Sequence, residues 1–371
     1  MRSYEAALRA FDAKAFWQEN KACFQPFSTD KPRVAACFMF EDHFLLNLLA
    51  IENTNQYYDD MPYRLACHVR ANDILEEALG ARFYPEDNIA YMKSEFEVRL
   101  GAARVITRGN TPWIEPRVED VEGIKALIDR VAKMDMRRDA IDPAWYEIRE
   151  DFRQKTGRRM RFEQGWNGPA TIACSVLGTT NLCFYLYDEP EVMRDFFEVV
   201  GAQYIAYREA VTLADSGVVD RAGIGINDDS CYIFTPADHA RYCVPFQKRF
   251  YEAFAPAPAH LRRHHSDSAM QHLIENLGAM GVNEVNIAPD IQATQIRERL
   301  PGAVIHGQIH PFLLKNGSPE DIVEKIRHDI RTVGTDGGLV ETVVGVIPEG
   351  TPLENMRLLL WAVQEYGRYG Q

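Results

Sequence analysis

The chain alternates short, mostly apolar runs with longer amphipathic stretches. The runs cover residues 33–40, 218–226, 260–264, 282–287, 303–305 and 338–340. Short runs of this kind between helical stretches are typical of buried parallel strands, and the stretches between them suit crossover helices. We count about seven or eight strands. This number favours an α/β fold closed as a (β/α)8 TIM barrel, with a doubly wound open sheet as the alternative.

The amphipathic stretches predict the helices of the barrel and of an N-terminal extension. We expect helices over residues 3–21, 63–79, 118–134, 143–156, 189–216, 238–254, 267–279, 292–299, 319–333 and 352–367. A further strand is expected over 171–177. A barrel of this class can use the whole chain, so we predict one domain over 1–371. Residues 1–32 would be a helical extension packed on it.

Most of the predicted strands end in a polar cluster. These clusters are Glu41-Asp42-His43, Asn227-Asp228-Asp229, His265-Ser266-Asp267, His306-Gly307-Gln308-Ile309-His310 and Glu341-Thr342. The carboxyl ends of the strands meet on one rim of a parallel barrel, and active sites lie there. The sequence therefore predicts an active site built from these clusters.

Alternation along a strand indicates which of these side chains lie together. His265 and Asp267 are two residues apart and should face the same side, as two metal ligands or as an acid–base pair. A structural hydrogen-bonded cluster is the alternative. By the same rule His306, Gln308 and His310 should line one wet pocket, with His306 or His310 available to a metal.

Carboxylates at the other strand ends could complete a metal site. Of Asp228 and Asp229 we expect Asp229 to face the pocket, with a helix cap or turn as the alternative role. Glu341 ends the last strand and could be a carboxylate ligand. Crowded carboxylates raise one another's pKa unless a cation lies among them. We therefore predict a divalent metal, most simply zinc, on His265, Asp267, His306 and Glu341.

Composition and charge restrict the class of protein. The net charge of −13 argues against a nucleic-acid partner. The sequence contains no apolar stretch of about 18 residues and no secretory signal, so no membrane association is expected. Seven scattered cysteines without a CxxC pair favour a reduced, cytoplasmic protein. Glycine-rich dinucleotide and phosphate loops are absent.

Several segments together carry a resemblance to a known family. They are residues 72–80, Gly168-Pro169-Ala170-Thr171, residues 186–190, Asp228-Asp229-Ser230 with the following 235–246, His265-Ser266-Asp267, and a C-terminal stretch over 345–355. In this order they resemble segments of the uroporphyrinogen decarboxylase superfamily, and residues 345–355 resemble its C-terminal signature. The resemblance implies a (β/α)8 barrel with its pocket at the strand ends. It also implies one of two chemistries: cofactor-free decarboxylation of a porphyrinogen, or methyl transfer to a corrinoid or a thiol by zinc-dependent relatives.

The chain departs from both branches of this superfamily. Glu41-Asp42-His43 stands where the decarboxylases carry an arginine-rich loop, and Val344 stands where they have a histidine. Asp73 alone remains of their usual catalytic set. In the zinc branch the resemblance implies a histidine-x-cysteine pair and a second cysteine. Here the histidine is His265, and the cysteine positions hold Asp267 and Val344.

The expected function is methyl transfer from a small methylated substrate, such as an aryl methyl ether, to a corrinoid protein. The chain lacks a corrinoid-binding motif, so the corrinoid would be carried by a partner protein, and the resemblance implies a homodimer. We expect catalytic roles for His265, Asp267, Asp73 and Asp229, and substrate contacts from Glu41, His43, Trp166, Asn167, Gln308 and His310. A carboxy-lyase with a substrate other than uroporphyrinogen, or a non-catalytic metabolite-binding barrel, are the alternatives.

Overall fold

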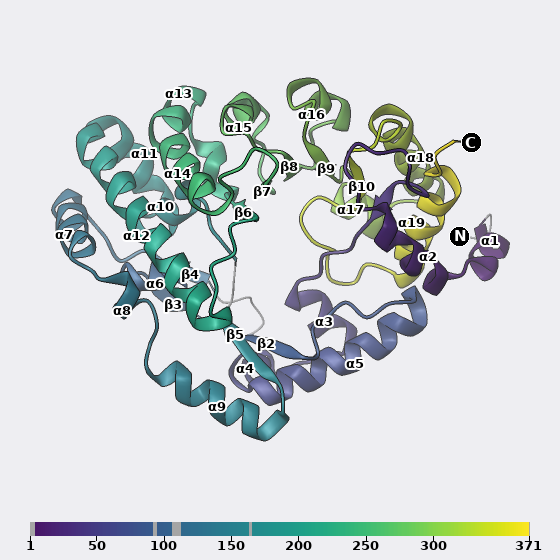
Figure 1. Cartoon of the computed structure of the whole chain (residues 1–371), viewed down its shortest axis with the longest axis horizontal. Helices are drawn as coiled ribbons and strands as arrows, with labels where there is room; N and C mark the ends of the chain where they lie inside the picture. The colour runs from purple at the N-terminus through teal and green to yellow at the C-terminus, as the bar shows by residue number, and fades with distance from the viewer. Residues whose placement is uncertain (1–3, 92–94, 106–112, 163–164, 371) are drawn as a thin grey trace.

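Six parallel strands form the central sheet of the structure, a computed structural model that describes residues 4–91, 95–105, 113–162 and 165–370 (Figure 1). Their order is β1 (Ala35–Ala36), β10 (Leu339–Glu341), β9 (Val304–His306), β8 (Glu284–Ile287), β7 (Leu261–Ser266) and β6 (Gly223–Asn227). Each lies within or across one of the predicted runs.

Two further parallel strands bring the number in the described part of the chain to eight. β2 (Asn88–Tyr91) pairs with β5 (Arg159–Phe162), and the chain that follows β5 reaches β6 through a parallel bridge between Asn167 and Asn227. The spatial order thus follows the order along the chain, as in a (β/α)8 barrel. Among the described residues no ladder joins β2 to β1. β3 (Ala103–Val105) and β4 (Trp113–Glu115) form a separate antiparallel pair.

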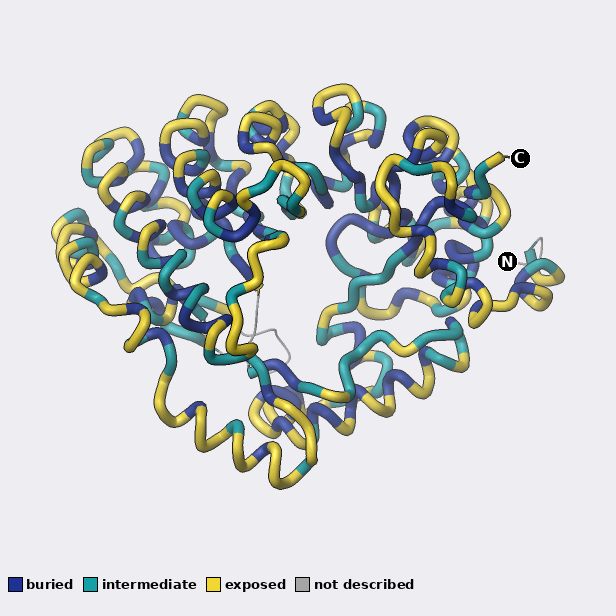
Figure 2. The backbone as a smooth tube through the Cα atoms, in the orientation of Figure 1, coloured by how far each residue is buried: buried dark blue, intermediate teal, exposed yellow. Residues whose placement is uncertain are grey.

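Helices surround the strands, with exposed outer faces and buried inner faces (Figures 1 and 2). The longer ones are α2 (Ala13–Asn20), α5 (Met61–Leu79), α7 (Val121–Ala132), α9 (Ala144–Thr156), α11 (Thr179–Asp188), α12 (Pro190–Ser216), α14 (Val244–Phe254), α18 (Pro319–Asp329) and α19 (Leu353–Tyr366). The shorter ones are α1 (Glu5–Ala10), α3 (Asp42–Leu48), α4 (Thr54–Asp59), α6 (Phe96–Arg99), α8 (Met136–Asp139), α13 (Pro236–Asp238), α15 (Ile274–Ala279), α16 (Ala293–Arg299) and α17 (Pro311–Asn316).

The strand predicted over 171–177 is wrong: this segment belongs to helix α10 (Pro169–Leu177). The run is apolar on nearly all sides, and periodicity does not distinguish a buried strand from a buried helix. Pro169 occupies the first turn, where the missing N–H costs nothing. The carboxylate of Asp228 accepts from the Thr171 N–H at 2.8 Å and so caps this helix from outside.

The two faces of the strands differ in character. The outward face carries apolar residues of the main core: Ile224, Ile226, Val285, Ile287, Ile305 and Leu339. The inward face carries polar side chains that contact one another across the barrel: Cys37, Arg263, His265, Glu284, Asn286 and His306. The strands are therefore not apolar on both sides, and the inward face combines these polar side chains with a small apolar cluster of Ala35, Val304 and Val340.

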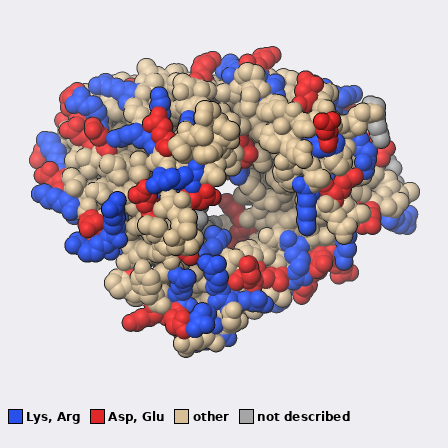
Figure 3. Space-filling model, viewed as in Figure 1, with Lys and Arg blue, Asp and Glu red and all other residues tan. Residues whose placement is uncertain are grey.

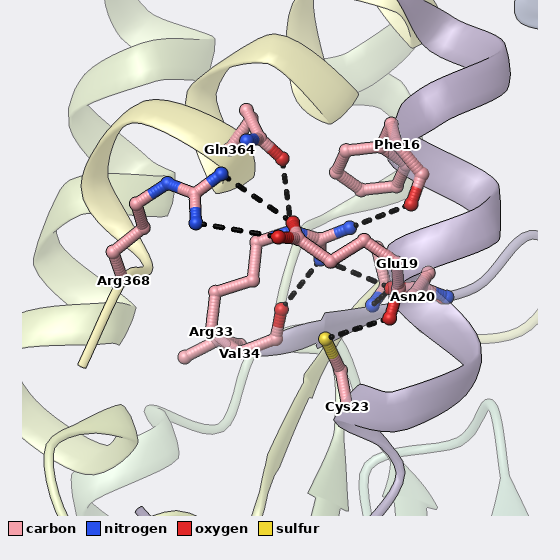
Figure 4. A network of polar contacts seen from close by, with 9 residues as sticks. Phe16, Glu19, Asn20, Cys23, Arg33, Val34, Gln364 and Arg368 are labelled. Carbon is pink, nitrogen blue, oxygen red and sulfur yellow. Dashed lines mark hydrogen bonds and ion pairs between the residues drawn. The ribbon is translucent and has the colours of Figure 1, made fainter. Parts of the chain in front are cut away.

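A buried arginine fastens the N-terminal helices to the barrel (Figure 4). The guanidinium of Arg33 donates to Asn20 Oδ1 and to the Phe16 carbonyl of α2, each at 3.0 Å, and to Gln364 Oε1 of α19 at 3.0 Å. Glu19 lies 3.3 Å from the same guanidinium. The first helices and the last one are thus held together beside β1.

No single helix in the described ranges is long and apolar enough to cross a membrane. α10 and α11 together pass a test of length and composition, but they meet at a bend of 104°.

Candidate functional site

Asp229, His265 and Asp267 converge beyond the carboxyl ends of β6 and β7. His265 Nε2 lies 3.5 Å from Asp267 Oδ1 and 3.9 Å from Asp229 Oδ1. The Asp267 N–H also donates to Asp229 Oδ1 at 2.8 Å. One ligand atom from each of these side chains lies within 4.8 Å of the other two. Among the residues that the structure describes, no other set of three histidine, cysteine, aspartate or glutamate side chains meets this condition.

Asn286 on β8 fixes the ring of His265. Its side-chain amide donates to the His306 carbonyl at 2.7 Å, and its Oδ1 accepts from the Gly345 N–H at 2.9 Å. These partners assign the amide orientation, so Oδ1 is the atom that faces His265 Nδ1 at 2.8 Å. His265 must therefore carry its proton on Nδ1. Nε2 then faces two carboxylates, which is the position that a metal ligand requires.

Asp228, next to Asp229, points into the wall of the barrel instead. Besides capping α10, it accepts from Gln247 Nε2 at 2.9 Å and is fully buried. Burial raises the pKa of Asp228 to about 7, although the hydrogen bonds from Thr171 lower it. A Cβ on Gly168 would lie 2.3 Å from the Asp228 carboxyl carbon, so only glycine fits there. Of the two neighbouring acids, Asp228 supports the fold and Asp229 faces the site.

The acids at the rim raise one another's pKa. Partial burial raises the pKa of Asp267, the charge of His265 lowers it, and that of Asp229 raises it again. Burial likewise raises the pKa of Glu41. The charge of His43 lowers this pKa and the charge of Asp267 raises it, so that it lies above its usual value overall. A divalent cation among these carboxylates would relieve their repulsion, and imidazole with carboxylate is a donor set that zinc and harder divalent ions accept.

A cavity of about 460 Å³ lies beside this cluster. It is lined by Glu41, His43, Asp267, Pro289, His310, Pro311, Phe312, Val344, Val346, Ile347, Pro348 and Glu349. Figure 3 shows a hollow at the centre of the molecule with acidic side chains on its wall. A lining that combines apolar and aromatic groups with acids suits a small uncharged or cationic molecule better than a polyanion.

Of the expected substrate residues, Glu41, His43 and His310 line this cavity, but Gln308 does not. The expected alternation from His306 to His310 fails because Gly307 has a φ of +121°, so the extended strand ends there. Gln308 turns into the wall and donates to the Ile287 carbonyl at 2.7 Å. His306 points inward, 3.4 Å from Glu284, and lies outside the metal cluster.

Glu341 was expected to be a metal ligand but lies on the outward face of β10. Its neighbouring charges are Asp329 and Lys325 of α18, and burial followed by Asp329 raises its pKa well above the usual value. The strand pleat explains the difference, because Val340 faces the small apolar cluster of Ala35 and Val304 while Glu341 faces the helices.

Asp73, Trp166 and Asn167 also lie away from the cluster. Asp73 is on the exposed face of α5, where its side chain is 64% exposed and pairs with Arg82 at 2.9 Å. Trp166 packs in the core under the guanidinium of Arg208. The amide of Asn167 donates to Glu97 Oε1 at 2.7 Å. The sequence around Asp73 could have excluded it as a site residue. The neighbouring Asn72 lies on the buried face of α5, so Asp73 must point toward the exposed face.

Sequence reasoning missed Asn286 and Phe312. Asn286 follows Glu284 by two residues, so both should face the same side of a strand, and this spacing was the available signal. Phe312 lies in the first turn of α17 and lines the cavity, a position that no strand periodicity predicts.

Comparison with known proteins places the chain in a family. Residues 97–366 match the family described as uroporphyrinogen decarboxylase (URO-D). The uroporphyrinogen decarboxylase of Microcystis aeruginosa is 23% identical over 268 residues, which is 68% of this chain and 71% of that protein. The enzyme of the same name from Anaeromyxobacter dehalogenans is 26% identical over 209 residues, which is 54% of this chain and 57% of that protein.

The fold also matches a solved structure. A methyltransferase from Methanosarcina mazei superposes with a TM-score of 0.64 over 96% of this chain and 99% of that one, at 16% identity. At this identity the likeness establishes the fold, and it agrees with the eight parallel strands seen here. With a family match that spans more than half of its residues, the chain belongs to the uroporphyrinogen decarboxylase (URO-D) family and has its TIM-barrel fold.

Proposed function

We propose that this protein is a metal-dependent methyltransferase of its family. It would move a methyl group from a small methylated substrate, such as an aryl methyl ether, to a corrinoid carried by a partner protein. The observation that carries the proposal is the triangle of Asp229, His265 and Asp267, with the His265 ring held so that its free nitrogen faces both carboxylates.

Each part of the site has a task in this proposal. Asp229, His265 and Asp267 would hold a divalent metal, which when bound supplies a Lewis acid for the ether oxygen of the substrate. Asn286 keeps the His265 ring in place and its proton on Nδ1. Phe312 and its apolar neighbours in the cavity would hold the aryl group and exclude water.

The charge of the cavity supports a small substrate over a porphyrinogen. Glu41, Asp267 and Glu349 line its wall, and these acids would repel the carboxylates of a polyanionic substrate. A second candidate, a carboxy-lyase with another substrate, is favoured by the names of the curated relatives. In such a lyase Asp73 would stabilise positive charge that develops on the substrate. Its position at the surface, paired with Arg82, argues against this candidate.

Metal content tests the proposal at the site itself. We expect purified protein to retain about one zinc or similar divalent ion per chain by elemental analysis, and Asp267→Asn and His265→Gln to bind it at least about 10-fold more weakly. Asp73→Asn is the matched control, since it makes the same change at an exposed aspartate and should leave metal binding unaltered. Equal metal content in all variants would contradict the assigned ligands.

Turnover separates the candidate functions. With cob(I)alamin and a panel of methoxyarenes, the proposal predicts methylcobalamin formation that stops with chelator and returns with zinc. Release of labelled carbon dioxide from carboxylated aromatics would favour the lyase. Binding of a methoxyarene without any product in either assay would indicate a non-catalytic barrel.

A further inference from the structure

A second polar cluster lies inside the barrel, apart from the proposed metal ligands. It consists of Cys37, which follows β1, Glu284 at the start of β8, and His306 at the end of β9. Cys37 Sγ lies 3.9 Å from His306 Nδ1, and His306 Nε2 lies 3.4 Å from Glu284 Oε2. Arg263 on β7 pairs with Glu284 from the other side at 3.7 Å.

The geometry is that of a relay and not of a chelate. The thiol and the carboxylate contact opposite nitrogens of the same ring, so a single metal ion could not take all three side chains. A thiol beside an imidazole whose far nitrogen is held by a carboxylate is instead the arrangement of an activated nucleophile.

The charges around the ring support this role. Burial lowers the pKa of His306, but the contacts with Cys37 and Glu284 outweigh it and bring the pKa to about 9. Burial would raise the pKa of Glu284, yet the hydrogen bond from His306 and the charges of His306 and Arg263 lower it overall. At neutral pH the cluster thus holds an imidazolium between the sulfur and a carboxylate.

The His306–Glu284 side of this cluster is open to a small cavity. That cavity, of about 160 Å³, is lined by His306 and Glu284 but not by Cys37, and its other titratable groups are Lys31 and Cys23. Cys37 is partly exposed, whereas the side chains of Cys23, Cys67, Cys231 and Cys243 are buried.

We propose that Cys37 is a nucleophilic thiol, activated by His306 and positioned through Glu284, that forms thioethers with small neutral electrophiles entering the barrel. Because His306 is already an imidazolium, it pairs with the Cys37 thiolate, whose proton has gone to solvent, and the sulfur attacks the electrophilic carbon. A C–S bond forms, and the leaving group departs with its electron pair. With iodoacetamide the products are the carboxamidomethyl thioether, iodide and the imidazolium.

The test measures iodoacetamide alkylation of each cysteine by peptide mass mapping between pH 5.5 and 8.5. We expect Cys37 to react about 10-fold or more faster at pH 7 than Cys183, a partly exposed thiol on α11. We also expect the Cys37 rate to change little across neutral pH. In His306→Gln it should fall about 10-fold at pH 7 and rise steeply up to pH 8.5, and Glu284→Gln should shift it in the same direction.

Controls separate this result from a change in folding or in metal content. His328→Gln alters an exposed histidine of α18 and should leave the Cys37 profile unchanged. The proposal would be overturned if the Cys37 rate rose equally steeply with pH in the wild type and in His306→Gln. It would also be overturned if Cys37 of the wild type were labelled no faster than Cys183. The labelling should persist in chelator, so failure of the proposed metal site would not remove it.

Discussion

At the scale of single residues, Asn286 determines the geometry of the candidate site. Its side chain is fully buried and makes contacts to β7, to β9 and to the loop that contains Gly345. A residue of this kind orients a ligand without being one, which is why a search for titratable side chains does not find it.

Another single residue, His239, predicts the response of stability to acid. It is fully buried, Asn276 donates to its Nδ1, and burial, followed by the charge of His272, lowers its pKa from 6.5 to about 4. Between these values the unfolded chain binds a proton that the folded protein does not, so stability falls as pH falls. When the pH is lowered from 7 to 4.5, the free energy of unfolding should therefore fall by about 2 kcal/mol less in His239→Gln than in the wild type. Urea unfolding at the two pH values measures this difference.

The control for this acid response is the exposed His328, for which His328→Gln should follow the wild-type curve. If the His239 variant lost as much stability on acidification as wild type, burial of a neutral imidazole would not be a source of acid sensitivity here.

At the scale of elements, the strand pleat decides which of the polar residues meet. It turns His265 and Asn286 inward and Glu341 outward, and it ends at Gly307 before the expected row of three polar residues is complete. The segment after β10 then returns over the site, with Gly345 packed against Asp267.

This close approach predicts the effect of Gly345→Ala. Gly345 has a φ of +71°, and an added Cβ would lie 2.5 Å from Asp267 Oδ1. We expect a destabilisation of about 1–2 kcal/mol from backbone strain, together with displacement of Asp267 and weaker metal binding. Thermal unfolding and metal titration measure the two effects.

Gly350→Ala is the matched control for this change. Gly350 has a φ of +68°, but its added Cβ would come no nearer than 3.7 Å to a neighbouring atom. It should show the backbone cost and unaltered metal binding. Loss of metal binding in both variants would mean that strain and not contact with Asp267 is responsible.

At the scale of the whole molecule, the chain termini are joined by the Arg33 network beside the first strand. Arg33 contacts α2 through Phe16 and Asn20, and α19 through Gln364. Removing the guanidinium takes away one of the two cationic partners of Glu19 and the charged hydrogen bonds to Asn20 and Phe16, and such bonds are typically worth about 1.5–3 kcal/mol. Arg33→Met should lower the melting temperature clearly and release the N-terminal helices to limited proteolysis.

Arg368→Gln is the comparison for Arg33→Met. Arg368 pairs with the same Glu19 at 3.4 Å, but its side chain is 32% exposed, so its loss should cost at most about 1 kcal/mol. Equal effects of the two substitutions would show that burial of Arg33 does not set the strength of this attachment.

Sequence alone determined the class of the fold and the two strands that carry the centre of the site. Apolar runs indicated six of the eight parallel strands, and spacing by two placed His265 and Asp267 on one side, because both properties are local and repeat along the chain. Of the two neighbouring acids, the structure groups Asp229 with His265 and Asp267 and turns Asp228 toward Thr171 and Gln247.

Only the tertiary structure decided which distant residues share the cavity. Periodicity did not show that the apolar run after Gly168 is a helix, that Gly307 breaks the strand pattern, or that Asp73 lies at the surface, since each depends on neighbours brought in from other elements. The pairing of Cys37 with His306 and Glu284 is of the same kind. Three strands far apart in the sequence supply it, and only barrel closure brings them within contact.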